Sequence, residues 1–282
     1  MVRSLAEPFF VAFAVSAALS PAGISGAFLL LPYQVSVLGL TGPSVTPTNH
    51  LFNILATPSG ITRFFRDGRF AWPLAALITL ACLPGSVLGA WARMHFLSDP
   101  KRFYLLLGLL LGFFAFRLGA SALRRQAAAD PGGPAPEARV GGGRLGLWRL
   151  QYEFAGATCS ASVPALALVC LLVGALGGAA GVGGGALIAP LLVSQFRLPV
   201  HSIGGATLTG NFVTSAASLT TFLLLGGPGD LPDWRLGLVL GLGGLCGTYV
   251  GATLQKRVPT RALVALLALG TLALASSYLL RL

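Results

Sequence analysis

Runs of mainly apolar residues recur along the chain, each close to the ~20 residues that a helix needs to cross a bilayer. Short segments rich in Arg, Pro and Gly separate these runs. Charged residues make up only 10% of the 282-residue chain, against about 25% in soluble domains. The sequence therefore predicts an all-α polytopic membrane protein that is surrounded by the lipid bilayer.

The basic residues are distributed as topology signals rather than as a binding surface. The net charge is +11, and the 19 Lys and Arg lie in short clusters between the apolar runs, where the residues that orient membrane helices are found. A nucleic-acid surface needs a basic stripe on one folded face, so we expect no nucleic-acid partner. The four cysteines show no paired spacing, and we expect no disulfide, metal site or cofactor.

Two parts of the chain share an ordered set of residues, which indicates an internal repeat. The stretch AGISGAFLLLP (22–32) aligns with AGVGGGALIAP (180–190) at an offset of 158 residues. The residue 158 positions later is of the same type at eight positions of the first copy: Gly23, Gly26, Leu29, Pro32, Ser36, Ser44, Asn53 and Phe64. After a four-residue insertion, Trp72, Gly85, Gly89 and Ala90 align with Trp234, Gly247, Gly251 and Ala252. We therefore predict two pseudo-symmetric halves.

A segment rich in Pro, Gly and charge, RRQAAADPGGPAPEARVGGGR (124–144), separates the two copies and is typical of a flexible linker. We predict a first membrane repeat over 1–123, a flexible basic linker over 124–150 on the cytoplasmic side, and a second membrane repeat over 151–282. Each repeat is expected to contain a glycine-broken apolar segment and three ordinary spans. The expected segments are 8–39, 47–65, 72–92 and 102–123, then 163–196, 203–225, 234–255 and 261–280.

The symmetry of the molecule depends on whether the broken segment crosses the membrane. If it is a re-entrant hairpin, each half has three crossings and the halves are inverted. If it crosses fully, the halves are parallel. Both arrangements place more Lys and Arg on the cytoplasmic side. We favour inverted repeats, because broken helices in inverted halves are a recurring transporter design.

Seven glycines lie in the apolar stretch GALGGAAGVGGGALIAP (174–190). An unpaired backbone group in a bilayer costs several kcal/mol, so a helix break there predicts a polar cavity lined by protein or water. Glycine exposes the backbone, and the free N–H groups at a helix N-terminus attract an anion. The candidate substrate-binding residues at the breaks are Gly23, Ser25, Gly26, Gly181, Gly183, Gly184 and Gly185. The alternative role is close helix packing, which we assign to Gly85, Gly89, Gly247 and Gly251.

The stretch GGAAGVGGGALIAPLL (177–192), followed by GGATLTGNF (204–212), resembles the glycine-rich signature of the TauE/SafE sulfite exporter family. The first-half copy, SPAGISGAFLLLP (20–32), is degenerate, because Ser25 and Ala27 stand where the second half has glycines. The resemblance implies a bacterial inner-membrane, multi-pass permease built of two similar halves. It also implies transport of small sulfur-containing oxyanions such as sulfite, sulfoacetate or organosulfonates.

Two asparagines, Asn53 and Asn211, correspond across the repeat and lie within apolar runs. A neutral amide can donate two hydrogen bonds to an oxyanion, so both are candidate ligands; a hydrogen bond between helices is the structural alternative. Nearby donors are Thr48, Asn49, Thr207 and Thr209, of which Thr207 is included in the candidate site. His50 shares a helical face with Asn53 and is a candidate proton relay, with a structural hydrogen bond as the alternative.

Two other functions compete with a permease. A passive anion channel would use the same features. An intramembrane serine protease of the rhomboid type is suggested by GISG (23–26), and it would need a histidine such as His201 beside Ser25. Since Ser25 aligns with a glycine in the more complete repeat, we expect a transporter working by alternating access, and not an enzyme. The sequence leaves the anion, the direction, the coupling ion and a homodimeric assembly open.

Overall fold

The structure is a computed structural model that describes residues 5–40, 43–97 and 138–259, with isolated positions from 99 to 116 and from 262 to 276. Most of this part of the chain is helical, as predicted. The predicted spans 102–123 and 261–280 lie almost entirely outside the described residues, as does most of the predicted linker.

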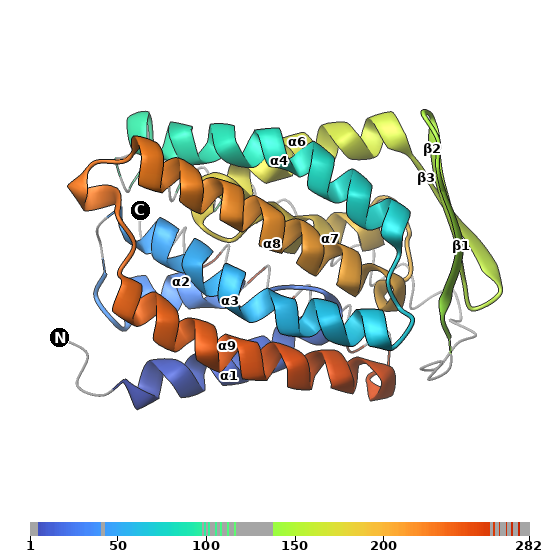
Figure 1. Cartoon of the computed structure of the whole chain (residues 1–282), viewed down its shortest axis with the longest axis horizontal. Helices are drawn as coiled ribbons and strands as arrows, with labels where there is room; N and C mark the ends of the chain where they lie inside the picture. Colours follow the sequence, from blue (N-terminus) through green and yellow to red (C-terminus); the bar gives the residue numbers. More distant parts are fainter. Residues whose placement is uncertain are drawn as a thin grey trace.

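The first half contains a broken segment and two long helices (Figure 1). Its elements are α1 (Ala6–Leu19), the short 3-10 turn η1 (Ser20–Ala22), α2 (Ala27–Ser36), α3 (Val45–Arg66) and α4 (Trp72–His95). The second half repeats this order with α6 (Val163–Ala180), α7 (Gly184–Ser194), α8 (Val200–Leu225), η2 (Pro228–Asp230), α9 (Trp234–Leu254) and η3 (Gln255–Arg257).

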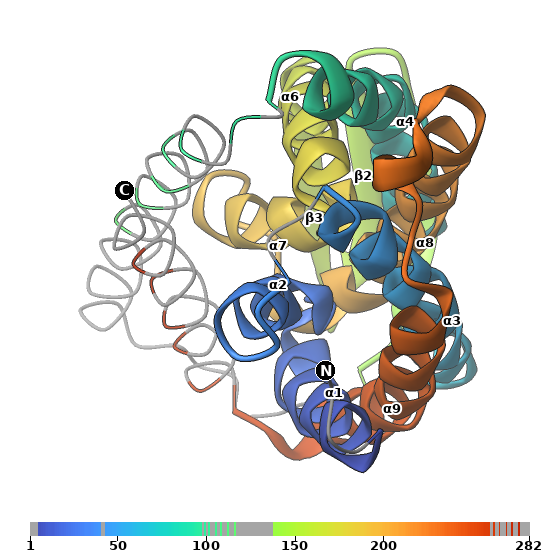
Figure 2. The same ribbon diagram turned by 90° about the vertical axis from the view of Figure 1, so that its left-hand side faces the viewer.

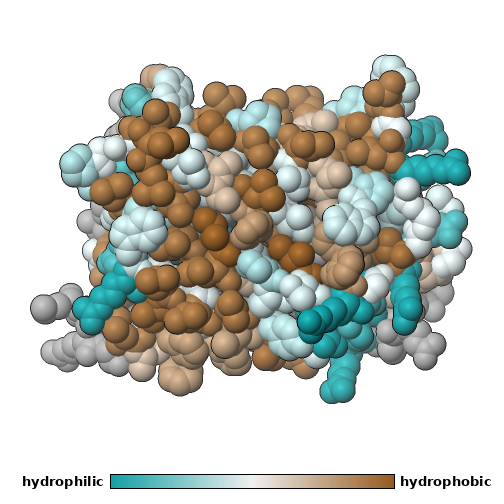
Figure 3. Space-filling model, in the orientation of Figure 1, coloured by the Kyte–Doolittle hydropathy of each residue, from teal (hydrophilic) through white to brown (hydrophobic). Residues whose placement is uncertain are grey.

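Four helical segments within the described ranges are long and apolar enough to cross a membrane: α4, α6, α8 and the unit Pro228–Arg257. Apolar side chains cover most of the face formed by α4, α8 and α9 (Figure 3), which suits contact with lipid tails. Helix α3 has 22 residues and is long enough at 1.5 Å per residue. It is more polar than the other long helices, and most of its polar side chains, including both asparagines and the histidine, are buried inside the bundle.

Each broken segment turns back on itself. In the first half Gly26 lies against Ser16, while the Tyr33 hydroxyl is 3.3 Å from Glu7 near the start of α1, so α1 and α2 are antiparallel. In the second half α7 begins beside α6, because Gly184 lies against Gly174. Viewed end on (Figure 2), α4 and α6 lie on one side of the bundle and α1 and α9 on the other, with α2 and α7 between them.

The two halves use equivalent helix–helix contacts, made by glycines that align in the sequence repeat. Helix α4 packs on α6 through glycines, and α9 packs on α1 through the aligned glycines. A Cβ placed on Gly89 would lie 1.8 Å from the carbonyl oxygen of Ala175. The four close contacts pair Gly85 with Leu171, Gly89 with Ala175, Gly247 with Phe13, and Gly251 with Ala17. These contacts confirm the packing role predicted for the four glycines.

We expect Gly89→Ala and Gly251→Ala to destabilise the protein to a similar degree. In each variant the new methyl group would meet a backbone carbonyl of the facing helix, at 1.8 Å and 2.4 Å respectively. Forcing such helices apart costs about 1–3 kcal/mol. Thermal unfolding of the detergent-solubilised variants measures the effect. Gly229→Ala is the control, since a Cβ on this exposed glycine has no atom of the described residues within 4 Å, and an equal loss in all three variants would contradict the prediction.

Helices α3 and α8 cross at the centre of the molecule and run antiparallel. Gly60 lies against Leu208, and Phe64 lies one turn further along against Gly204. Asn211 Nδ2 donates to Asn53 Oδ1 at 2.9 Å. The two aligned asparagines therefore meet each other at the crossing.

A three-stranded antiparallel sheet at one end of the bundle corrects the all-α prediction. Its strands are β1 (Val140–Leu145), β2 (Arg149–Phe154) and β3 (Ala157–Ser162), in the order β1-β2-β3. The prediction of a flexible linker over 124–150 is therefore wrong for residues 140–150, which form β1, the turn and the start of β2. The sequence signal was present in β2, where buried Leu150, Tyr152 and Phe154 alternate with exposed residues, the period of a strand with one buried face.

The sheet is fixed to the end of the bundle where α3 ends and α8 begins (Figure 1). The buried Tyr152 hydroxyl lies 2.7 Å from Ser202 Oγ on α8. Val140 N donates to the Gly68 carbonyl, 2.8 Å away, in the turn between α3 and α4. Strand β3 continues directly into α6. The sheet thus contacts both halves of the molecule.

Candidate functional site

The two helix breaks are made by glycines in conformations that other residues rarely adopt. Gly23 ends η1 with φ of 75°, and Gly181 ends α6 with φ of 74°. Gly183 has φ of 76° and ψ of 146°, a region that is essentially restricted to glycine. The break in the second half therefore has two such positions within three residues.

Each break packs against the long central helix of the other half. A Cβ on Gly23 would lie 2.7 Å from Thr207 Oγ1 on α8, and Thr207 Oγ1 donates to the Gly23 carbonyl at 2.7 Å. At the equivalent place in the other half, a Cβ on Gly181 would lie 2.6 Å from the Thr46 carbonyl on α3. The glycines are thus needed both for the turn and for the close approach of the facing helix.

Asn53 is the centre of a buried hydrogen-bond network. Its Nδ2 donates to the Val182 carbonyl at 3.2 Å and to the Gly181 carbonyl at 3.4 Å. Its Oδ1 accepts from Ser25 Oγ and from Asn211 Nδ2. The side chain joins both breaks to both central helices, and it satisfies two carbonyls that the end of α6 leaves without helical partners.

Asn53 was predicted to donate hydrogen bonds to the substrate. In this conformation its side chain instead binds the backbone of the second break. Both amide hydrogens are used by backbone carbonyls, and the residue is fully buried. The site is closed, because Ser25, Asn211 and Thr207 are also buried. A solute could contact the amide only after the breaks move relative to α3 and α8.

Asn211 differs from Asn53 although the two residues align. Its Nδ2 is bonded to Asn53, but its Oδ1 has no hydrogen-bond partner among the described residues, nor does Ser215 Oγ. Both atoms face Gly183, since a Cβ there would lie 1.9 Å from Asn211 Oδ1 and 2.9 Å from Ser215 Oγ. In the first half, Ser25 occupies the aligned position and supplies the hydroxyl that Asn53 Oδ1 accepts. The two sides of the site are therefore chemically unequal.

Helix α7 begins in the site, with Gly184 as its first residue. Gly184 N donates to Thr214 Oγ1 at 3.1 Å, and Gly185 lies against the Thr207 carbonyl. The N-terminus of a helix carries unpaired N–H groups and a partial positive charge. The sequence interpretation missed Thr214 and Ser215, which follow Asn211 by three and four residues and could have been found from that helical spacing.

His50 lies next to the second break and is fully buried. Its Nε2 is 3.0 Å from the Gly178 carbonyl, so Nε2 carries the proton and donates. Its Nδ1 has no partner in the part of the chain that the structure describes.

The other predicted donors near the breaks bind backbone carbonyls. Asn49 Nδ2 donates to the Ala27 carbonyl at 2.9 Å. Thr48 and Thr209 bind carbonyls of their own segments, away from the central asparagines.

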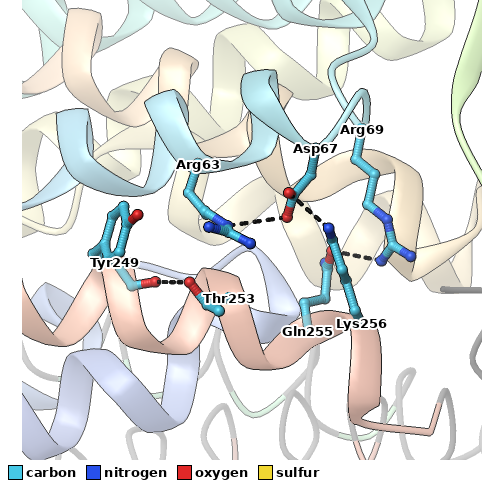
Figure 4. A network of polar contacts seen from close by, with 7 residues as sticks. All are labelled: Arg63, Asp67, Arg69, Tyr249, Thr253, Gln255 and Lys256. Carbon is cyan, nitrogen blue, oxygen red and sulfur yellow. Dashed lines mark hydrogen bonds and ion pairs between the residues drawn. The ribbon is translucent and has the colours of Figure 1, made fainter. Parts of the chain in front are cut away.

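The end of the bundle that bears the sheet also carries a charged network (Figure 4). Asp67 at the end of α3 accepts from Arg63 at 3.2 Å and from Lys256 at 2.7 Å. Arg69, which is buried, donates to Gln255 Oε1 at 3.4 Å. These contacts join the end of α3 in the first half to the end of α9 in the second.

The network reaches the first break as well. Gln255 Nε2 donates to the Pro21 carbonyl at 2.8 Å, two residues before the left-handed Gly23. Burial lowers the pKa of Arg69, and the nearby Asp67 carboxylate partly offsets this. A positive charge is therefore held inside the protein between the first break and the sheet.

The contacts of Ser25 do not form a catalytic pair. Its Oγ donates to Asn53 Oδ1 and accepts from Ala27 N. Neither contact involves a histidine, although a serine protease needs a base within hydrogen-bond reach of its nucleophile. The serine instead supports the helix break.

Comparisons with known proteins find relatives that are described as membrane transporters. The family model described as "Sulfite exporter TauE/SafE" matches residues 9–278. The chain is similar to a "probable membrane transporter protein" of Xylella fastidiosa strain 9a5c, with 28% identity over 86% of this chain and 82% of that protein. A protein of Sinorhizobium fredii with the same description is 25% identical over 88% of this chain and 87% of its own length. No solved structure matches the chain significantly.

Proposed function

The chain belongs to the sulfite exporter TauE/SafE family and is a multi-pass membrane transporter, and from this premise we propose that it is a permease for small sulfur-containing oxyanions. Sulfite, sulfoacetate and organosulfonates are the proposed substrates, and an inner-membrane location is part of the proposal. No enzymatic step is needed for this function.

The observation that carries the proposal is the meeting of both helix breaks at the crossing of α3 and α8. The N-terminus of α7 lies there, beside Gly183, Asn211 and Ser215, and the buried Ser215 hydroxyl, which can donate to an anion, has no partner within the described ranges. Backbone N–H groups at such a terminus attract an anion without a permanent cation, which lets the solute leave again. We propose that Gly181, Gly184, Gly185 and Thr207 complete this binding site, with Gly23, Ser25, Gly26 and Asn53 on the opposite side.

We propose further that the two halves are inverted repeats that alternate in access. Support comes from the antiparallel crossing of α3 and α8 and from the aligned pair Asn53 and Asn211, which contact each other. A two-fold axis between these residues would be perpendicular to both helices, and would therefore lie in the membrane plane. Transporters of this design move one half against the other around a central site.

The charge distribution supports an orientation with the sheet in the cytoplasm. The sheet end of the bundle carries nine basic and two acidic residues within the described ranges: Arg63, Arg66, Arg69, Arg139, Arg144, Arg149, Arg197, Lys256 and Arg257, with Asp67 and Glu153. The opposite end carries Glu7, Arg93, Asp99, Lys101, Asp230, Asp233 and Arg235. An excess of Lys and Arg is typical of cytoplasmic loops. The Asp67 network would then close the cytoplasmic side in this conformation.

His50 is the proposed proton carrier if transport is linked to protons. Its Nδ1, which has no partner among the described residues, and its bond to the Gly178 carbonyl in the last turn of α6 support this role. We expect His50→Gln to keep the fold, since the amide can still donate to the carbonyl, and to lose most of the effect of a pH gradient on flux. A variant that responds to the gradient as the unmodified protein does would remove His50 from the coupling mechanism.

Flux into proteoliposomes tests the function. We expect saturable uptake of sulfite or a sulfonate, and competition among these anions, with weaker competition by sulfate and thiosulfate. Flux that does not saturate with concentration would instead indicate a passive channel. Absence of flux for every sulfur oxyanion, in vesicles that contain correctly folded protein, would contradict the proposed substrate class.

A further inference from the structure

The turn between β1 and β2 presents apolar side chains that no part of the described protein covers. We call residues 144–149, with the sequence RLGLWR, the hairpin tip. Leu147 is 88% exposed and Trp148 is 76% exposed. Gly146 N donates to the Arg149 carbonyl at 3.0 Å, which closes the turn. Apolar side chains that are exposed together and bordered by polar residues are typical of a surface that contacts another protein or a membrane.

Two arginines bracket this tip on one face of the sheet. Arg144 lies opposite Gln151 in the strand pairing, and Arg149 lies two residues before Gln151 on the same strand. Residues opposite each other, or two apart along a strand, share a face. Arg144 and Arg149 are therefore diagonal neighbours, and both are exposed. Neither forms an ion pair within the described part of the chain.

The tip lies beside the start of a membrane helix. Val163, the first residue of α6, donates its N–H to the Trp148 carbonyl at 3.0 Å. One to three turns further along α6, Leu168 and Leu172 are 59% and 57% exposed, as expected for side chains that face lipid tails. The apolar tip is therefore close to the level at which α6 leaves the hydrocarbon region.

We propose that the hairpin tip is a binding site for anionic phospholipid in the leaflet that α6 enters. Leu147 and Trp148 lie among the lipids at the membrane interface, where tryptophan is enriched. Arg144 and Arg149 bind the phosphate of the headgroup, because guanidinium groups donate paired hydrogen bonds to phosphate. The bilayer is the occupant of this surface because the tip continues the lipid-facing side of α6 and carries the charge that complements an anionic headgroup.

Fluorescence of a single tryptophan tests the insertion of the tip. The chain has four tryptophans, so the variant Trp72→Phe, Trp91→Phe, Trp234→Phe leaves Trp148 as the only one. After reconstitution into vesicles we expect lipids brominated near the headgroup to quench most of its emission, and aqueous acrylamide to quench it little. Strong quenching by acrylamide with no quenching by brominated lipid would overturn the proposal.

The arginines are tested by stabilisation with added lipid. In detergent, we expect phosphatidylglycerol to raise the melting temperature more than phosphatidylcholine does, and the double variant Arg144→Gln, Arg149→Gln to lose this difference. Arg235→Gln is the matched control, since Arg235 is exposed at the other end of the bundle, and it should keep the difference. Inorganic phosphate distinguishes a lipid site from a simple phosphate site, because it should not replace the lipid.

A full phosphatidylglycerol effect in the double variant would overturn the role of the arginines. An equal stabilisation by inorganic phosphate alone would overturn the lipid as the ligand. Neither measurement depends on transport, so the outcome is independent of the proposed oxyanion function.

Discussion

Gly183→Ala is expected to abolish transport, with a fall in flux of about 100-fold or more, equivalent to about 2.7 kcal/mol. Gly183 has φ of 76° and ψ of 146°, which costs an alanine about 1–3 kcal/mol. The new methyl group would also lie 1.9 Å from Asn211 Oδ1 and 2.9 Å from Ser215 Oγ. The second break would have to open at the place where we propose that the anion binds. Flux of radiolabelled sulfite into proteoliposomes measures the loss.

The matched control is Gly39→Ala. Gly39 also has a positive φ, of 70°, but a Cβ there has no atom of the described residues within 4 Å, and the residue lies in the connection between α2 and α3. The backbone strain is thus of a related kind, while the central site is left intact. We expect this variant to keep most of its flux. Equal losses in both variants would mean that strain anywhere in the chain, and not the site at Gly183, limits transport.

Asn53→Leu is expected to destabilise the protein far more than Asn211→Leu, although the two residues align. Leucine at position 53 leaves the carbonyls of Gly181 and Val182, the Ser25 hydroxyl and the Asn211 amide without their partner. Each unsatisfied buried group costs about 1–3 kcal/mol. We expect Asn53→Leu to fold poorly and to show no flux.

Asn211→Leu removes one hydrogen bond, and the Oδ1 that it deletes had no partner among the described residues. We expect this variant to be extracted as a folded protein, with a modestly lower melting temperature and a higher KM for the anion. Thermal unfolding and the concentration dependence of flux separate the two effects. Similar melting temperatures for the Asn53 and Asn211 variants would contradict the asymmetry. An unchanged KM in Asn211→Leu would assign Asn211 a structural role only.

The repeat in the sequence singled out a corresponding pair of polar residues, because aligned residues occupy equivalent places in each half. Asn53 and Asn211 were singled out by their alignment alone, and the structure brings them into contact. The alignment could not predict that their hydrogen bonds differ. That difference arises from Ser25 standing where the second half has Gly183, and its effect depends on a contact across the bundle.

For the glycines, too, the sequence located the helix break but could not predict which glycine is most tightly packed. The sequence predicted that the tract from Gly181 to Gly185 breaks a helix, and a substitution at Gly184 was as reasonable a test as one at Gly183. In the structure a Cβ on Gly184 would be 3.1 Å from the Cα of Gly174 and 3.2 Å from Cys82, which neighbours can partly accommodate. The stronger constraints are at Gly183 and Gly185, whose close partners lie on α8.

By itself the sequence determined that this protein lies in a lipid bilayer, and it determined where the helices are interrupted. A chain with so few charges must satisfy its backbone inside a bilayer, so long apolar helices and paired glycine breaks follow from composition and spacing. Only the tertiary structure decided which carbonyls the breaks leave open, which side chains bind them, and that the segment before α6 is a sheet fixed to both halves. These features depend on contacts between residues far apart in the chain, such as Asn53 with Val182, and local sequence patterns carry no record of such contacts.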